Sequence, residues 1–222
     1  MLATTAADYF DAYKLALDTG TLTQGAFHIE SDGRQLACAL GVVGPEVNGP
    51  KDCPATIMPR WLAQMVPAFF DGQRKGDAFA WGLAFAEALK RLDGKVPFSV
   101  IHDWHANAVC QLGIDAAIRR NRDPDPHEAL KALHLRALAG EQITADEWRP
   151  VLKNACADAC ADASADAYAY ANADAYAYAY ANAYAYASAS AYASAYANAK
   201  AWKLLAEGMV AALNRAPIVS AA

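Results

Sequence analysis

Two histidines three positions apart are the side chains in this chain best suited to metal chemistry. They lie in the segment His102-Asp103-Trp104-His105. On a helix these two histidines share a face, from which both imidazoles can reach one ion. Cys110 does not lie on that face, and the chain has no HExxH motif that would complete a ligand set. A metal-dependent enzyme with its site near His102 and His105 is therefore one hypothesis, and ordinary surface or half-buried histidines are the alternative.

Known catalytic motifs are missing from the sequence. It contains no P-loop, no GxGxxG segment after a strand and no GxSxG nucleophile elbow. The carboxylates are scattered singly or stand at expected helix starts, where capping and the helix dipole account for them. The sequence therefore predicts no catalytic residue and no cofactor, and it favours a protein that is not an enzyme.

An alternating segment, residues 155–201, has alanine at every odd position, and we call it the tract. Its even positions are mostly Tyr, Asp, Asn or Ser. Tyrosine is common at binding interfaces because it offers a large amphipathic area at low entropic cost. Simple solvation of an alanine scaffold is the alternative. The tract supplies nine candidate partner-binding residues, which are Tyr168, Tyr170, Tyr176, Tyr178, Tyr180, Tyr184, Tyr186, Tyr192 and Tyr196.

The periodicity of the tract leaves its secondary structure open. In a strand, the alternation puts every alanine on one face and the tyrosines on the other. Every eighth residue from Asp166 to Asn198 is compatible with a turn, so a β-solenoid of eight-residue units is one alternative. Alanine is also the best helix former, and a long helix is the favoured prediction. Disorder is the third alternative, because the tract lacks Leu, Ile, Val and Phe.

Helix signals flank the tract on both sides. Before it, residues 144–147 (Thr-Ala-Asp-Glu) form a capping box, and Ile143 with Trp148 forms a hydrophobic staple. Pro150 predicts a kink or a restart of this helix. After the tract, apolar residues at spacings of three and four predict one buried helical stripe, made of Trp202, Leu205, Met209 and Leu213.

The first 143 residues hold nearly all the large apolar side chains that can build a core. Their periodicity predicts about six short helices joined by short loops. Residues 26–30, followed by Asp32-Gly33, are the best strand signal outside the tract, and residues 44–54 are expected to be a loop. The expected helices begin at Thr5, near Leu36, at Pro59, at Asp77, at Ser99 and at a capping box, Asp125-Pro126-His127-Glu128. The helix from Ser99 is expected to bury Val100, Trp104, Ala108, Leu112 and Ile118.

Composition and patterning together divide the chain into three parts of a mainly α protein. Residues 1–143 are expected to form the compact helical domain. Residues 144–216 comprise the alternating tract with its C-terminal helix, and residues 217–222 are a tail.

Charge and hydropathy argue against two classes of partner. The net charge is −5, whereas a nucleic-acid binder usually shows a basic face, and the basic residues 119–122 are typical of a helix end. No stretch is apolar over about 18 residues, so no membrane span is expected. Residues 1–5 lack the features of a signal peptide, and the five cysteines are irregularly spaced. These features predict a cytoplasmic protein.

Two segments carry a resemblance to a known group of proteins. Residues 33–41 (GRQLACALG) and residues 53–63 (CPATIMPRWLA) resemble uncharacterised bacterial and phage proteins that carry a small helical domain followed by a long alanine-rich repeat. The resemblance covers residues 30–145 and implies the same two-part build. The alanine-rich half is similar, more loosely, to immunity proteins of bacterial toxin systems. In those relatives the repeat has paired alanines, and the strict alternation here departs from that pattern.

These observations lead to one favoured hypothesis and two alternatives for function. The favoured one is a non-enzymatic accessory protein of immunity or inhibitor type, of phage or mobile-element origin, that binds another protein or a second copy of itself. The first alternative is the metal-dependent enzyme near His102 and His105. The second is a repetitive β surface that binds an ordered lattice or assembles with itself.

Overall fold

The computed structural model describes residues 2–218 except for 161–198, and it confirms the predicted mainly α fold. Within these residues a two-stranded antiparallel sheet is found beside the helices. Both described ends of the tract, residues 155–160 and 199–201, belong to helices. The choice between helix and β-solenoid for the rest of the tract lies outside the described residues.

The described elements are mainly helices joined by short connections. Their bounds are α1 Ala6–Asp18, β1 His28–Ser31, β2 Arg34–Ala37, η1 Gly41–Val43, η2 Pro50–Asp52, α2 Arg60–Gly72, α3 Lys75–Arg91, α4 Ser99–Trp104, η3 His105–Val109, α5 Cys110–Arg119, α6 Asp125–Leu138, α7 Ala145–Cys160 and α9 Ala199–Arg215. Here η1 and η2 are 3-10 helices, and η3 is a π-helix.

Contacts between residues divide the chain into two compact units. Unit 1 comprises Met1–Pro97 and Leu213–Ala222, and unit 2 comprises Phe98–Ala212. This division differs from the boundary expected after residue 143, which rests on composition. The large apolar residues before residue 143 serve two cores, and α9 supplies residues to both units.

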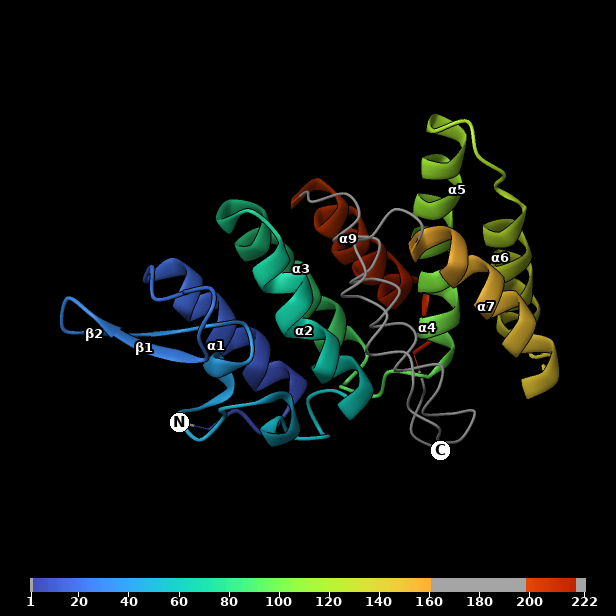
Figure 1. The fold of residues 1–222 in the computed structure, drawn as a ribbon. Coiled ribbons are helices and arrows are strands. Elements are labelled where there is room, and N and C mark those ends of the chain that lie inside the picture. Colours follow the sequence, from blue (N-terminus) through green and yellow to red (C-terminus); the bar gives the residue numbers. More distant parts are fainter. Residues whose placement is uncertain (1, 161–198, 219–222) are drawn as a thin grey trace. The chain divides into compact units, whose positions relative to one another are not determined.

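Unit 1 is built on α3, which packs against α1 and α2 (Figure 1). The predicted capping box opens α1, because the Thr5 hydroxyl accepts from the Asp8 amide while the Asp8 carboxylate accepts from the Thr5 amide. Tyr9 and Tyr13 of α1 are buried with their hydroxyls bonded, to the carbonyls of Ala39 and Phe79. Two large aromatic rings thereby enter the core without leaving a polar atom unpaired.

A hairpin, β1 and β2, lies beside α1 (Figure 1). Its turn residues Asp32 and Gly33 both have positive φ, which a tight two-residue hairpin turn requires. The predicted strand and turn are thus confirmed. The predicted helix near Leu36 is wrong, because Leu36 pairs with Ile29 in the sheet and only Gly41–Val43 is helical.

Three other expected features also differ. Residues 44–54 contain the 3-10 turn η2 within the predicted loop. The helix expected from Asp77 begins at Lys75, and Asp77 lies in its first turn, where its charge suits the helix dipole. The capping box predicted at Asp125 does not form, since Asp125 is already helical and its amide donates to the Asp123 carboxylate.

In unit 2, α4, η3 and α5 follow one another directly, and η3 interrupts the predicted stripe of buried residues. A π-helix bonds from i to i+5 and so contains more residues per turn than an α-helix. Residues after η3 are therefore rotated relative to the predicted face. Leu112 stays buried, but Ile118 is 60% exposed and Ala117 is buried instead.

The helices that flank the tract agree with most of the predicted signals. Thr144 and Glu147 form the predicted capping box at the start of α7. The helix continues through Pro150, so the restart predicted there is wrong. In α9, Leu205, Met209 and Leu213 are fully buried, and Trp202 is half-buried. No helix in the described part of the chain is both long and apolar enough to cross a membrane.

Gly82 of α3 allows the close approach of α1, and its replacement tests this packing. A Cβ at Gly82 would overlap the Tyr13 hydroxyl, whereas a Cβ at Gly76 of the same helix would meet no atom. We expect Gly82→Ala to lower the free energy of unfolding by about 1–3 kcal/mol, because the buried Tyr13 ring must move. Gly76→Ala should be neutral or stabilising by up to about 1 kcal/mol. Urea unfolding followed by far-UV circular dichroism measures both, and equal effects of the two variants would contradict the packing.

Candidate functional site

Three histidines from separate elements of unit 2 meet in a cluster, which we call the histidine cluster. It consists of His102 of α4, His105 of η3 and His134 of α6. The Nδ1 atoms of His102 and His134 are hydrogen-bonded at 3.0 Å. On its other side the His134 ring stacks on His105, with centroids 4.4 Å apart and planes within 12° of parallel. His134 is therefore the central member, and it contacts both of the others.

The cluster is largely shut off from water and poorly supplied with hydrogen bonds. His105 is 1% exposed and His134 is 5% exposed. Among the described residues, neither ring nitrogen of His105 has a hydrogen-bond partner, nor does Nε2 of His134. Most buried polar side-chain atoms in proteins are paired, so three orphaned nitrogens in one cluster point to a role other than packing.

Burial keeps the three imidazoles uncharged. It lowers the pKa of His105 to about 3, with a further decrease caused by His102. Burial also lowers the pKa of His134 well below the ordinary value, and His105 and His102 add to that decrease. The pKa of His102, the half-buried member, is lowered by burial alone. Neutral imidazoles are the stable form because a charge in this site would lose its hydration without gaining a counter-ion.

Two tryptophans enclose the histidine cluster. Trp148 of α7 stacks on His102 with centroids 6.0 Å apart and lies 4.8 Å from His134. Trp104 of α4 meets His105 edge to face at 5.0 Å. The Trp104 indole donates a hydrogen bond of 2.8 Å to the carbonyl of Leu205 in α9. The cluster thus joins α4, η3 and α6 to the helices on both sides of the tract.

Each member of the predicted pair of metal ligands, His102 and His105, contacts His134. His102 bonds to His134, and the parallel rings of His105 and His134 have no common in-plane position for an ion. Within residues 2–160 and 199–218, no group of three or more His, Cys, Asp or Glu side chains is arranged to hold a metal ion. The geometry assigns no ligand, and the metal site stays a prediction.

The spacing of His102 and His105 does not point to His134, although α6 carries a signal for it. His127, Leu130 and His134 follow one another at spacings of three and four, and all three are buried. That spacing puts them on one helical face. A histidine on an apolar stripe is the signal that would have placed His134 in the core.

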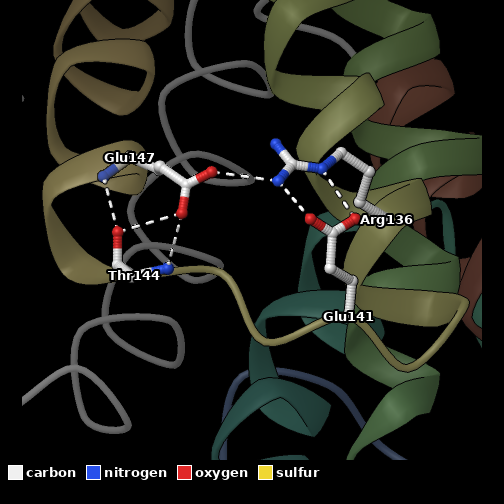
Figure 2. A network of polar contacts seen from close by, with 4 residues as sticks. All are labelled: Arg136, Glu141, Thr144 and Glu147. Atoms are coloured by element: carbon white, nitrogen blue, oxygen red, sulfur yellow. Dashed lines mark hydrogen bonds and ion pairs between the residues drawn. The ribbon is translucent and has the colours of Figure 1, made fainter.

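The connection from α6 to α7 is fixed by a polar network (Figure 2). Arg136 donates through Nε and Nη2 to the two carboxylate oxygens of Glu141, and Nη2 also bonds Glu147 at 2.9 Å. The Glu147 carboxylate accepts from the amide and hydroxyl of Thr144, both at 3.0 Å. These bonds lower the pKa of Glu141 and Glu147 and raise that of Arg136. The start of α7 is therefore tied to the end of α6.

The helices on either side of the tract are anchored in the same unit. In α7, Leu152 and Ala155 share a buried cluster with Cys110 of α5 and Leu130 of α6. In α9, Leu205 accepts the bond from Trp104, and Gly208 lies so close to Ala108 of η3 that a Cβ there would overlap the alanine methyl. The nine predicted partner-binding tyrosines, between residues 168 and 196, lie outside the described residues.

Comparison with known proteins finds no relative of this chain. No protein-family model matches the sequence, and no curated protein or solved structure shows significant similarity to it. The resemblance to alanine-rich bacterial and phage proteins therefore stays a prediction, and function must be argued from the residues themselves.

The capping box of α7 is testable by a pair of conservative changes. Thr144→Ala removes the hydroxyl that accepts from the Glu147 amide. We expect it to lower the free energy of unfolding by about 1 kcal/mol, as loss of a helix cap usually does. Thr144→Ser keeps the hydroxyl and should retain most of the stability. Urea unfolding of the full chain checks both variants, and an unchanged midpoint for Thr144→Ala would show that the cap contributes nothing.

Proposed function

We propose that this protein is a non-enzymatic accessory protein of immunity or inhibitor type that binds another protein through its tyrosine-bearing tract. We also propose a phage or mobile-element origin, which rests on the sequence resemblance. The observation that carries the binding proposal is the anchoring of both flanks. The first residues of the tract belong to α7 and the last belong to α9, and in unit 2 both helices are held by buried contacts.

Anchored flanks suit a binding segment for a thermodynamic reason. Ordering a chain on binding costs conformational entropy for each residue that becomes fixed. Here α7 and α9 are already held by buried contacts of Leu152, Ala155 and Leu205. The two ends of the tract therefore need no further ordering, and a partner meets a segment whose entry and exit are set by the fold.

The composition of the tract supplies the surface for binding. Nine tyrosines alternate with alanine and with short polar residues. A tyrosine ring contributes area and a hydroxyl while it fixes only two side-chain torsions, which is why tyrosine dominates many protein-binding loops. Alanine between the tyrosines adds little bulk to the segment.

Affinity capture with matched variants tests this function. The full chain, a variant with all nine tract tyrosines changed to serine, and a variant with residues 161–198 replaced by a short Gly-Ser linker are used as baits in a lysate of the native host. We expect one protein to be enriched by the full chain alone. The purified partner should bind the serine variant at least about tenfold more weakly, since one interface tyrosine often contributes more than 1 kcal/mol.

The controls separate binding from folding and from self-association. Far-UV circular dichroism and the thermal midpoint should show that units 1 and 2 stay folded in both variants. Sedimentation velocity of the full chain alone tests whether the partner is a second copy. Capture of the same proteins by all three baits, with no change in affinity, would exclude the tract as the binding segment.

A further inference from the structure

A hollow in the surface of unit 1 lies beside the β1–β2 hairpin, and we call it the hairpin hollow. Its volume is about 480 Å³, comparable to that of small-ligand sites. Its polar lining consists of His28 of β1, Gln35 of β2 and Asn48 of the loop after η1. Val42 and Pro45 supply apolar surface. None of the described residues that line the hollow is Lys, Arg, Asp or Glu.

The register of the hairpin and a close backbone approach bring these groups together. Glu30 of β1 lies opposite Gln35 of β2, which puts the side chains of His28 and Gln35 on the same face of the hairpin. Gly41 of η1 lies so close to β1 that a Cβ there would overlap the Phe27 carbonyl and stand 3.1 Å from Cε1 of His28. Glycine at this position therefore allows η1 to lie against the His28 ring.

The His28 ring has a defined tautomer. Its Nε2 atom lies 3.0 Å from the carbonyl oxygen of Val47, which can only accept, so Nε2 carries a proton. In the neutral ring, Nδ1 then has an unshared lone pair. Among the described residues this Nδ1 has no hydrogen-bond partner. It is therefore an acceptor that a ligand in the hollow can use.

The two amide side chains also present acceptors. Asn48 donates through Nδ2 to the carbonyl of Glu46 at 3.2 Å. Gln35 donates through Nε2 to the Glu30 carboxylate at 3.5 Å. The amide oxygens, Oδ1 of Asn48 and Oε1 of Gln35, have no partner within the described part of the chain. Together with Nδ1 of His28 they give the hollow three acceptors, while the donors of the same three side chains are engaged.

The charges around the hollow favour a cation. The carboxylates of Glu30 and Asp52 each accept a hydrogen bond from a lining residue. Arg34 and Lys51 are exposed, and neither lines the hollow. An anion would meet acceptors and nearby carboxylates without gaining a side-chain donor. A cation that carries N–H groups gains both hydrogen bonds and attraction.

We propose that the hairpin hollow binds a guanidinium group, whose N–H donors bond Nδ1 of His28 and the amide oxygens of Gln35 and Asn48. A guanidinium presents five donors in one plane and is more weakly hydrated than an ammonium, so its flat faces suit the apolar surface of Val42 and Pro45. The group can belong to a small guanidine compound or to an arginine of a partner protein. This site does not rest on the proposed role of the tract.

NMR titration of the full chain with methylguanidinium chloride tests the site. The Cε1–H signal of His28, assigned by its loss in His28→Phe, and the methyl signals of Val42 report on the hollow. We expect both to shift and to saturate with a dissociation constant on the order of 1–10 mM, because neutral acceptors at an open surface give a weak site. The signals of the other histidines, all in unit 2, should not move.

Two further compounds define the chemistry that is recognised. Tetramethylammonium chloride has the same charge but no N–H donor, and it should cause no saturable shift. Nα-acetylarginine amide presents the guanidinium on a peptide-like frame. Binding of this compound at least about threefold tighter than methylguanidinium assigns the site to an arginine of a partner protein, and equal or weaker binding assigns it to a small compound.

Variants of equal charge provide the matched comparison. Asn48→Asp replaces the amide by a carboxylate of the same shape, and we expect methylguanidinium to bind at least about fivefold more tightly. Asn154→Asp makes the same change on the exposed surface of α7 and should leave the affinity unchanged within about twofold. His28→Phe removes an acceptor and should weaken binding at least about threefold, read from Val42. Should His28→Phe fail to fold, the two aspartate variants decide the matter, and His28→Gln assigns the ring signal.

Three results would overturn the site. The first is the absence of a saturable shift of the His28 and Val42 signals up to about 100 mM methylguanidinium. The second is an equal affinity for tetramethylammonium, and the third is an equal change of affinity in Asn48→Asp and Asn154→Asp. None of these measurements involves the tract. Failure of the site therefore leaves the capture experiment unaffected, and failure of that experiment leaves the site standing.

Discussion

Burial of uncharged imidazole rings is the interaction on which unit 2 depends. His134 enters from α6 and meets His102 and His105, while Trp148 of α7 closes over them. A charged residue in the same place would need a counter-ion. The cluster packs as an apolar core does, although its members carry polar ring nitrogens. Contacts of Trp148 with His102 and His134 hold α7 against α4 and α6.

Features set by residues close together in the chain were predictable from the sequence. The capping pairs Thr5 with Asp8 and Thr144 with Glu147 are three residues apart, and both form as expected. Features set by distant residues were not predictable. Leu36 matches a helical stripe, but its strand forms because residues 28–31 lie opposite it. The capping box predicted at Asp125 is a local exception, because Pro124 is the N-cap and Asp125 is already helical.

The candidate site shows the same limit. Spacing alone selected His102 and His105, and both belong to the cluster, but their shared neighbour His134 comes from another helix. Periodicity within α6 could place His134 on a buried face. It could not show that this face meets α4 and η3, because that meeting depends on how whole helices pack. The proposed partner-binding role of the tyrosines rests on composition, because the tyrosines lie outside the described residues.

The π-helix η3 determines which side chains of α5 face the core. One residue corresponds to a rotation of about 100° around an α-helix. Loss of a single residue from His105–Val109 would turn α5 by that angle and alter which side chains face the core. The predicted stripe, which leads to Ile118, assumes an α-helix without the π turn. Ile118 is exposed because the π turn rotates it away from the buried face. Deletion of one codon in this segment would thus change the register of the whole of α5.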